Sequence, residues 1–227
     1  MVSVLTLDKK GLLSAVLLGL LLLLLGRSEG PLFFFSMLFF LIAGAAVTRI
    51  KASRKKVLGV HDPDRGWRNV WANGAVPFFV AVLYFISSFV DQRAGTAITV
   101  AYIAVVAAIT ADKFSSELGV LDKKTYMLLT AQRIRPGTSG GVSVLGLVFG
   151  LLAAVLVAGV FGLTYFGSVA VFVLIAAAGF AGDLVDSVFG YFEDKGTGNK
   201  FTTNVACGAS AAVVALVVYS WLYLYLI

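Results

Sequence analysis

The sequence predicts an all-α membrane protein with about seven transmembrane helices and a single domain. Three observations carry this prediction. Of the 227 residues, 59% are hydrophobic and only 13% are charged. The mean hydropathy is +0.95, and a water-soluble domain of this size could not bury so much apolar surface, because part of any fold must face water. Apolar stretches follow one another along the chain, with no linker that would separate a soluble domain.

A helix needs roughly 20 mostly apolar residues to cross a bilayer. The expected spans are 11–26, 31–48, 70–90, 95–112, 141–164, 168–190 and 203–226. The first span is short, and its basic and apolar pattern is that of a signal peptide. No small-x-small cleavage site follows it, so we expect it to remain in the protein as a helix.

Basic residues gather in alternate loops. The expected loops 49–69, 113–140 and 191–202 are all basic, whereas the intervening loops hold only Arg27 and Arg93. Positively charged loops remain on the cytoplasmic side of a membrane. The sequence therefore predicts a multi-pass protein of the cell membrane with its N-terminus inside and its C-terminus outside.

The cysteine and histidine content limits the metal chemistry. Cys207 is the only cysteine and His61 the only histidine, which excludes an intramolecular disulfide and a metal site built on these residue types. Any metal should be a hard cation with oxygen ligands. The net charge of +6 is attributed to topology, and no nucleic-acid partner is expected. The basic 49–69 loop should contact anionic lipid headgroups, with His61 as an ordinary loop residue.

Carboxylates occur at the cytoplasmic ends of two expected spans. A charge costs about 2.5–3.5 kcal/mol at the bilayer centre and is functional by default. In "GFAGDLVDSVFG", Asp183 and Asp186 share one helical face with small residues, and they repel each other unless a cation or an arginine lies between them. Asp112 and Glu117 follow at the end of another span. Such a group suits Mg²⁺, which shares its shell with substrate phosphates. The plain alternative is that the carboxylates are solvated or paired with loop arginines. We expect the metal ligands to be Asp112, Glu117, Asp183 and Asp186.

The segment "RIRPGTSGGVS" precedes the 141–164 span. Glycine-rich turns and helix N-termini bind phosphate through backbone N–H groups, and arginines can grip phosphate oxygens. The Gly-Lys-Ser/Thr ending of a Walker A loop is missing, and an ordinary turn is the alternative. Its position opposite the carboxylates favours phosphate binding. The expected phosphate contacts of this segment are Arg133, Arg135, Gly137, Thr138, Ser139, Gly140, Gly141 and Ser143.

Asparagines stand at the start of the third and the seventh span. A buried asparagine, such as Asn73 or Asn204, more often makes an interhelical hydrogen bond than a ligand contact. Because several polar span ends lie on one side, a shared polar site is the favoured interpretation for these residues.

Five motifs together resemble a known family. "RNVWANG", "ADKFSSELGVL", "PGTSGGVSVLG", "GDLVDSVFG" and "GNKFTTN" occur in the order seen in integral-membrane phytyl-phosphate kinases. The resemblance covers about residues 65–204 and implies Asp112, Asp183 and Asp186 as catalytic residues. Lys113 departs from the family, which usually has a small hydroxyl residue there, and it is expected to contact phosphate. The matched positions are Asn73, Asp112, Glu117, Thr138, Ser139, Gly140, Gly141, Asp183, Asp186, Ser187 and Asn204.

The resemblance implies a membrane prenyl-phosphate kinase that uses Mg²⁺ at the cytoplasmic face. The expected partners are a nucleotide triphosphate, with CTP favoured, a phytyl- or geranylgeranyl-type monophosphate, and the lipid bilayer. Such a reaction depends on positioning and charge neutralisation rather than on a general base. Three alternatives stay open: a cytidylyltransferase that makes a CDP-lipid, a protein that only binds prenyl phosphate, and a transporter. Against the transporter, its binding site would be expected near the midplane.

Overall fold

The computed structural model describes residues 7–59 and 66–226. Within these residues, six helices are long and apolar enough to cross a membrane. The predicted class, an all-α protein with several spans, is therefore confirmed. His61, which was expected to be an ordinary loop residue, lies outside the described residues. The helices are α1 (Lys9–Leu25), η1 (Arg27–Glu29), α2 (Gly30–Arg49), α3 (Ala52–Val57), α4 (Trp67–Ser87), α5 (Gln92–Gly119), α6 (Val144–Val157), η2 (Ala158–Leu163), α7 (Thr164–Phe166), α8 (Val169–Asp194) and α9 (Lys200–Leu226).

The first expected span forms α1, which is shorter than the six helices that meet the length for a span. It has 17 residues and is therefore about 25 Å long at 1.5 Å per residue. The hydrocarbon core of a bilayer is about 30 Å thick. Helix α1 packs against α2 and α4, so it is part of the bundle although it is the shortest candidate to span the membrane.

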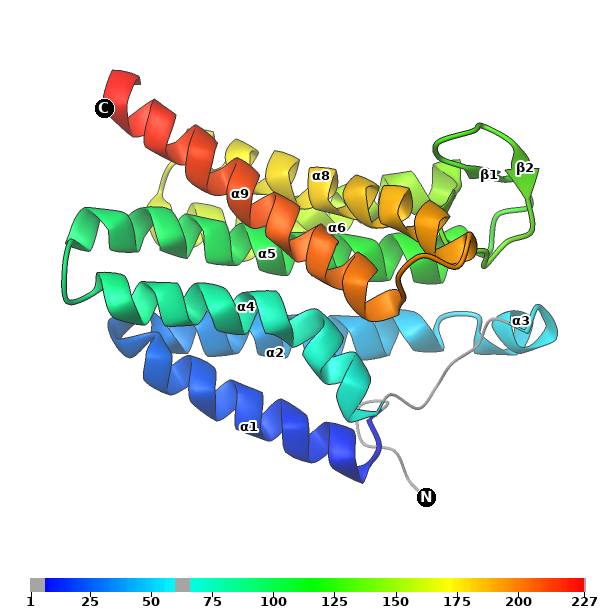
Figure 1. Ribbon diagram of the computed structural model, residues 1–227, viewed down its shortest axis with the longest axis horizontal. Coiled ribbons are helices and arrows are strands. Elements are labelled where there is room, and N and C mark those ends of the chain that lie inside the picture. The colour runs from blue at the N-terminus through cyan, green and yellow to red at the C-terminus, as the bar shows by residue number, and fades with distance from the viewer. Residues whose placement is uncertain (1–6, 60–65, 227) are drawn as a thin grey trace.

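The helix ends alternate between the two ends of the bundle. Figure 1 shows the start of α1, the short helix α3, the sheet and the α8–α9 turn at one end, and the C-terminus at the other. These are the segments that carry the basic loops of the sequence. Their common location agrees with the predicted sorting of the loops, and the orientation of this end towards the cytoplasm stays a prediction. We call it the polar end.

Helix α5 is the central helix of the bundle. It packs against α2, α4, α6, α8 and α9, and every residue from 99 to 112 is buried. Small residues allow this approach. A Cβ added to Gly179 of α8 would lie 2.6 Å from the Cβ of Ala107, and one added to Gly182 would lie 2.7 Å from that of Ala108. At these two positions the missing side chain lets α8 pack closely against α5.

Helix α5 continues beyond the expected end of its span at residue 112. It runs to Gly119, so Lys113 and Glu117 lie in its last turns instead of in a loop. The expected boundary followed the loss of apolar residues, but a helix can continue with a polar face. An ion pair between Lys113 and Glu117, four residues apart, supports the extra turns.

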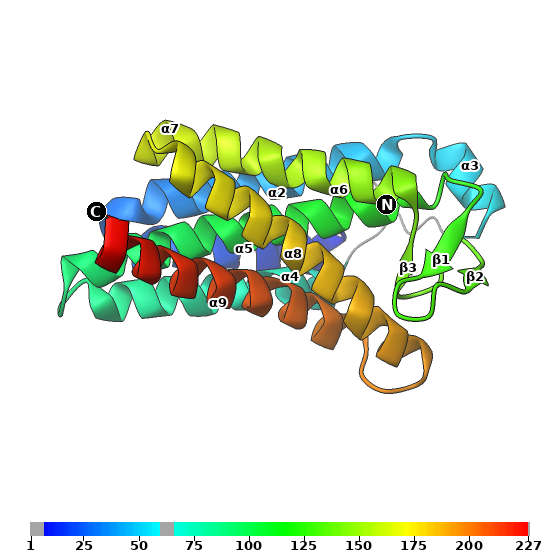
Figure 2. The same ribbon diagram turned by 90° about the horizontal axis from the view of Figure 1, so that it is seen from above.

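A small antiparallel sheet, which the sequence analysis did not predict, lies between α5 and α6. Its strands are β1 (Thr125–Met127), β2 (Arg133–Ile134) and β3 (Gly141–Val142), in the order β2-β1-β3. Figure 2 shows the sheet at the polar end of the bundle, near α3 and the end of α8. Helix α6 begins later than the expected residue 141 because β3 comes first and Ser143 caps the helix, accepting a hydrogen bond from Gly146 N at 3.1 Å.

The basic loop 49–69 contains the short helix α3, and one of its lysines is buried. Lys55 is 0% exposed and donates hydrogen bonds to the carbonyl oxygens of Val47 and Thr48 at the end of α2, at 3.0 and 3.2 Å. Lys55 therefore fastens α3 to the bundle and is not available to lipid headgroups. Its neighbours Arg54 and Lys56 are exposed, as expected for that role.

Candidate functional site

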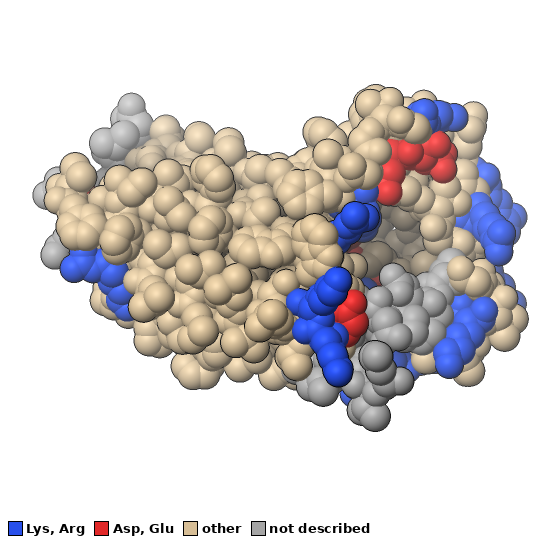
Figure 3. Space-filling model, turned by 60° about the horizontal axis from the view of Figure 1, so that its bottom comes forward, with Lys and Arg blue, Asp and Glu red and all other residues tan. Residues whose placement is uncertain are grey.

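A cavity of about 400 Å³ opens at the polar end between α5, α8, the sheet and the starts of α6 and α9. Figure 3 shows acidic and basic residues around a hollow at this end. We call it the carboxylate cavity. The sequence-predicted residues that line it are Asp112, Glu117, Gly137, Thr138, Ser139, Gly140, Gly141, Ser143, Asp183, Asp186 and Ser187.

Asp183 is held by one neighbouring helix and given space by another. It is 2% exposed, and its Oδ1 accepts a hydrogen bond of 2.7 Å from the hydroxyl of Ser115 on α5. Its Oδ2 is buried and has no hydrogen-bond partner among the described residues. Gly150 of α6 leaves room for this oxygen, since a Cβ there would lie 2.5 Å from it. The side chain is thus oriented at one oxygen and unsatisfied at the other.

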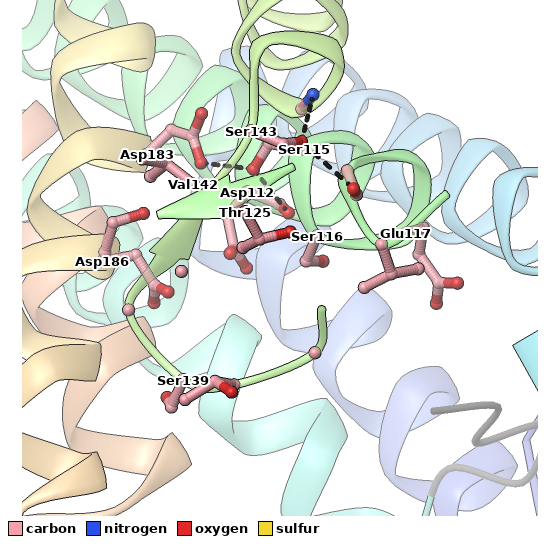
Figure 4. Close-up of a pocket in the computed structure, with 18 of the residues that line it drawn as sticks. Asp112, Ser115, Ser116, Glu117, Thr125, Ser139, Val142, Ser143, Asp183 and Asp186 are labelled. Atoms are coloured by element: carbon pink, nitrogen blue, oxygen red, sulfur yellow. Dashed lines mark hydrogen bonds between the residues drawn. The ribbon is translucent and has the colours of Figure 1, made fainter. Parts of the chain in front are cut away.

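Asp186 lies one turn further along α8 and has a similar arrangement. Its Oδ2 accepts a hydrogen bond of 3.3 Å from Nζ of Lys200, the first residue of α9. Its Oδ1 is buried, again with no partner in the part of the chain that the structure describes. Figure 4 shows Asp183 and Asp186 side by side, with Asp112 and Ser115 on the facing helix. The predicted small, polar face of α8 therefore does turn inward.

The unpaired oxygens bear on whether a cation fits. No group of three or more His, Cys, Asp or Glu residues within residues 7–59 and 66–226 is arranged to hold a metal ion. Mg²⁺, however, often takes one or two carboxylates and completes its shell with water and substrate phosphates. A buried polar atom without a partner costs about 1–3 kcal/mol or more. The two unpaired oxygens of Asp183 and Asp186 fit this partial ligand set.

Glu117 lines the cavity, but its carboxylate is already engaged. Its Oε2 accepts a hydrogen bond of 2.7 Å from Lys55, its Oε1 accepts one of 2.8 Å from Thr48, and Lys113 also binds Oε1. This carboxylate compensates the buried charge of Lys55. The geometry favours a structural role for Glu117, which holds Lys55 of α3, over the metal-binding role expected from the sequence. Lys113, which was expected to contact phosphate, forms an ion pair with Glu117.

The glycine-rich segment forms one wall of the cavity and is fixed to α8. Gly140 has φ of +77°, and a Cβ there would lie 2.5 Å from the backbone nitrogen of Tyr191. Ser139 donates a hydrogen bond of 2.9 Å to Glu193 at the end of α8. Thr138 closes a turn by donating from its backbone N–H to the carbonyl of Arg135 at 3.2 Å. The segment therefore forms a turn, which was the alternative to a phosphate-binding loop, and this turn lines the same cavity as the carboxylates.

The two predicted arginines are directed elsewhere. Arg133 donates to the carbonyl of Lys123 at 3.4 Å, and Arg135 to that of Leu58 at 3.2 Å. Neither is among the described residues that line the cavity. Arg133 lies in β2, an edge strand of the sheet, and Arg135 follows it. The directions of these side chains could not be foreseen, because the sheet itself was not predicted. Ser143 lines the cavity but uses its hydroxyl to cap α6 and to donate to Gly119 O at 3.1 Å.

A second cavity of about 1010 Å³ adjoins the first. It lies between the starts of α1, α4 and α9 and the end of α5, and we call it the asparagine cavity because Asn69, Asn73 and Asn204 line it. It also receives Lys113. Apart from Arg133 and Arg135, the structure thus divides the predicted phosphate contacts between two cavities. The residues common to both are Asp112, Ser116, Glu117 and Lys200.

Asp122 connects the sheet to α6. Its carboxylate accepts hydrogen bonds from the backbone N–H groups of Lys124 at 3.2 Å and Leu145 at 3.5 Å. The hydrogen bond from Lys124 stabilises the ionised form, and it lowers the pKa of Asp122 below its usual value. This contact holds the sheet, and with it the glycine-rich wall, against the first turn of α6.

Two residues of the site were missed by the sequence analysis. Ser115 follows Asp112 at a spacing of three, which places both on one helical face, but the helix was not expected to extend that far. Lys200 occurs in the quoted motif "GNKFTTN". Its contact with Asp186 joins two helices through a turn and leaves no local signal in the sequence.

Comparison with known proteins gives one family. A family model described as "Integral membrane protein DUF92" matches residues 1–222. An uncharacterized membrane protein of Methanocaldococcus jannaschii is 33% identical over 94% of this chain and 86% of its own length. Protein PGR of Arabidopsis thaliana is 27% identical over 78% of this chain and 70% of its own length. An uncharacterized membrane protein of Synechocystis is 31% identical over 66% of this chain and 59% of its own length. No solved structure matches the chain.

Proposed function

Because the chain belongs to the DUF92 family of integral membrane proteins and carries the ordered motifs that resemble phytyl-phosphate kinases, we propose that it is a prenyl-phosphate kinase. It transfers the γ-phosphate of a nucleotide triphosphate, with CTP as the expected donor, to a phytyl- or geranylgeranyl-type monophosphate. The active site is the polar end of the bundle, placed at the cytoplasmic face of the cell membrane.

One observation carries the proposal. Two buried carboxylates, Asp183 and Asp186, each keep an oxygen with no partner in the described chain, and they share a cavity with a glycine-rich turn. Carboxylates alone would repel an anionic substrate. A divalent cation between carboxylates and phosphates removes that repulsion, as in many phosphoryl-transfer sites. The combination therefore supports a site for a phosphorylated substrate with Mg²⁺.

The donor is assigned to the carboxylate cavity. Its phosphates would bind along the turn 137–141, and Asp183 and Asp186, with Asp112 in the same cavity, would hold Mg²⁺. When bound, Mg²⁺ neutralises charge on the phosphates. Lys200 borders both cavities and supplies a positive charge where the two substrates meet.

The reaction needs no proton transfer by the protein. An oxygen of the acceptor monophosphate attacks the γ-phosphorus of CTP, the bond from that phosphorus to the β,γ-bridging oxygen breaks, and CDP leaves. The acceptor oxygen is already ionised near neutral pH. The residues of the site position the two anions and lower their repulsion, which is the main catalytic requirement of phosphoryl transfer.

The proposal is tested with purified protein, Mg²⁺ and geranylgeranyl monophosphate, using CTP labelled at the γ or at the α position. A kinase transfers the γ label to the lipid and releases CDP. A cytidylyltransferase transfers the α label and releases pyrophosphate. The second outcome would replace the kinase by the cytidylyltransferase, the alternative that would use the same carboxylates and the same glycine-rich turn.

A further inference from the structure

An apolar groove adjoins the asparagine cavity. It lies between α1, α2 and the start of α4, and its volume is about 90 Å³. Representative lining residues are Leu18, Gly19, Phe34, Met37, Asn69 and Asn73. Besides the two asparagines, every residue that lines the groove among those described is apolar or glycine.

Asn69 and Asn73 belong to both the groove and the asparagine cavity. The side-chain N–H of Asn73 donates to the backbone oxygen of Asn69 at 3.0 Å and to its side-chain oxygen at 3.2 Å. The two amides are therefore fixed to one another on α4. They form a polar border at which an apolar space meets a polar one.

The polar side of this border is lined by four basic residues, Lys10, Arg68, Lys113 and Lys200, and by three acidic ones, Asp8, Asp112 and Glu117, a formal excess of one positive charge among the described residues. Lys113 pairs with Glu117, and Lys200 pairs with Asp186. The basic side chains offer contacts to an anionic group there, whereas the groove favours hydrocarbon. A molecule that satisfies both sides has an anionic head and an apolar chain attached directly to it.

We infer that the groove between α1, α2 and α4 binds the part of the prenyl tail nearest the acceptor phosphate, while the phosphate itself occupies the asparagine cavity. This inference rests on the proposed function, since it assumes a prenyl monophosphate as the acceptor. It places the acceptor on the α4 side of Asp112 and Lys200 and the donor on the α8 side. It also gives α1, the shortest candidate span, a role in substrate selection.

The size of the groove sets its role. A single water needs about 10–15 Å³ of such space, so a groove of about 90 Å³ has room for a short piece of chain and not for a whole C20 tail. The groove thus binds the first isoprenoid unit, and the rest of the tail extends into the bilayer. Selectivity should depend on the structure near the phosphate more than on total length.

Direct labelling tests the location without relying on turnover. The full-length protein in liposomes is irradiated with a C20 prenyl monophosphate that carries a diazirine in its first isoprenoid unit, and the labelled peptides are identified by mass spectrometry. We expect label on α1 and α2, removed by excess geranylgeranyl monophosphate but not by geranylgeraniol or phosphatidylcholine. Label confined to α6, α8 or α9, no label, or competition by phosphatidylcholine would overturn the inference; the last result would identify the groove as a general lipid site.

A substitution tests the same point by kinetics. Ala15 lines the groove, and Ala15→Trp should raise the KM for geranylgeranyl monophosphate about tenfold, the equivalent of losing roughly two buried CH₂ groups, with an unchanged KM for CTP. The matched control is Leu13→Trp on the same helix, at a position 71% exposed, which should leave both constants unchanged. Ala15→Leu, a smaller change, provides a second variant should the first not fold. An unchanged acceptor KM in a folded groove variant would contradict the inference.

The two proposals fail in different ways. Specific labelling of α1 and α2 without any phosphoryl transfer would refute the kinase and leave the prenyl-phosphate site standing. Phosphoryl transfer together with unaltered acceptor KM in the groove variants would refute only the location of the tail.

Discussion

Ser115 on α5 donates a hydrogen bond of 2.7 Å to Oδ1 of Asp183 on α8. Two residues 68 positions apart thus join the central helix to the helix that carries the paired carboxylates. The bond fixes the rotation of the carboxyl group, and it leaves Oδ2 as the oxygen available to a ligand. Charge-assisted hydrogen bonds of this kind are shorter and stronger than neutral ones.

Ser115→Ala should therefore weaken the metal site without removing a proposed ligand. We expect the Mg²⁺ concentration for half-maximal activity to rise about tenfold, which corresponds to about 1.4 kcal/mol and is near the value of a hydrogen bond to a charged group. Titration of activity with Mg²⁺ measures this shift. Ser210→Ala is the control, because the Ser210 hydroxyl donates a hydrogen bond within its own helix, to Cys207 O. An unchanged Mg²⁺ titration in Ser115→Ala would show that this bond does not orient a metal ligand.

Lys200→Met should lower kcat at least about 100-fold, since the substitution removes the positive charge at the border of the two cavities while keeping the length of the side chain. Lys200→Arg, which retains the charge, should recover part of the activity. Steady-state kinetics with both substrates separate an effect on kcat from one on KM. Lys195→Met is the matched control at the C-terminal cap of α8, where Nζ of Lys195 lies over the Tyr191 ring. If Lys200→Met turns over like the control, Lys200 only pairs with Asp186.

Gly140→Ala should displace the glycine-rich wall from α8. The new Cβ would lie 2.5 Å from the backbone nitrogen of Tyr191, and the residue has φ of +77°. The strain of this φ alone costs about 1 kcal/mol or more. Gly167→Ala measures the cost of a positive φ by itself, because Gly167 has φ of +63° and nothing lies within 4 Å of an added Cβ. Thermal unfolding should show a larger loss for Gly140→Ala, together with weaker CTP binding; equal losses would mean that the contact with α8 adds nothing.

Glu117→Gln should destabilise the fold by about 3 kcal/mol, because it leaves the charge of Lys55 buried without its carboxylate. Unfolding in detergent measures this effect. The double variant Lys55→Met/Glu117→Gln should regain stability, since no buried charge remains unpaired. A third comparison distinguishes anchoring from catalysis: the apparent Mg²⁺ affinity of Glu117→Gln should equal that of the unaltered protein. A clear loss of Mg²⁺ affinity would restore Glu117 as a metal ligand.

The apolar spans and the inward face of α8 were predictable because both depend on local patterns. Runs of apolar residues set the spans, and the spacing of Gly179, Gly182, Asp183 and Asp186 sets the face. The partners of Glu117 were not predictable in the same way. Lys55 lies 62 residues away, in a basic segment whose composition indicated lipid contact, and the pairing exists only because α3 folds back onto the end of α2.

The directions of Arg133 and Arg135 were missed for a related reason. The strands β2 and β3 have two residues each, too few to show the alternation of apolar and polar residues that marks a strand. The pairing of Tyr126 with Arg133 on one side and with Val142 on the other creates the wall of the cavity. It also separates the arginines from the glycines that follow them.

Transfer of the γ label of CTP to geranylgeranyl monophosphate by the unaltered protein, by Asp183→Asn and by Asp186→Asn tests the central claim most directly. Each substitution replaces a proposed anionic ligand of Mg²⁺ by a neutral side chain of similar size. Asp194→Asn, an exposed residue at the end of α8, is the control. We expect labelled diphosphate from the unaltered protein and the control, and a loss of at least about 1000-fold in both site variants at equal folding. Near-native transfer by Asp183→Asn and Asp186→Asn at limiting Mg²⁺ would contradict the account.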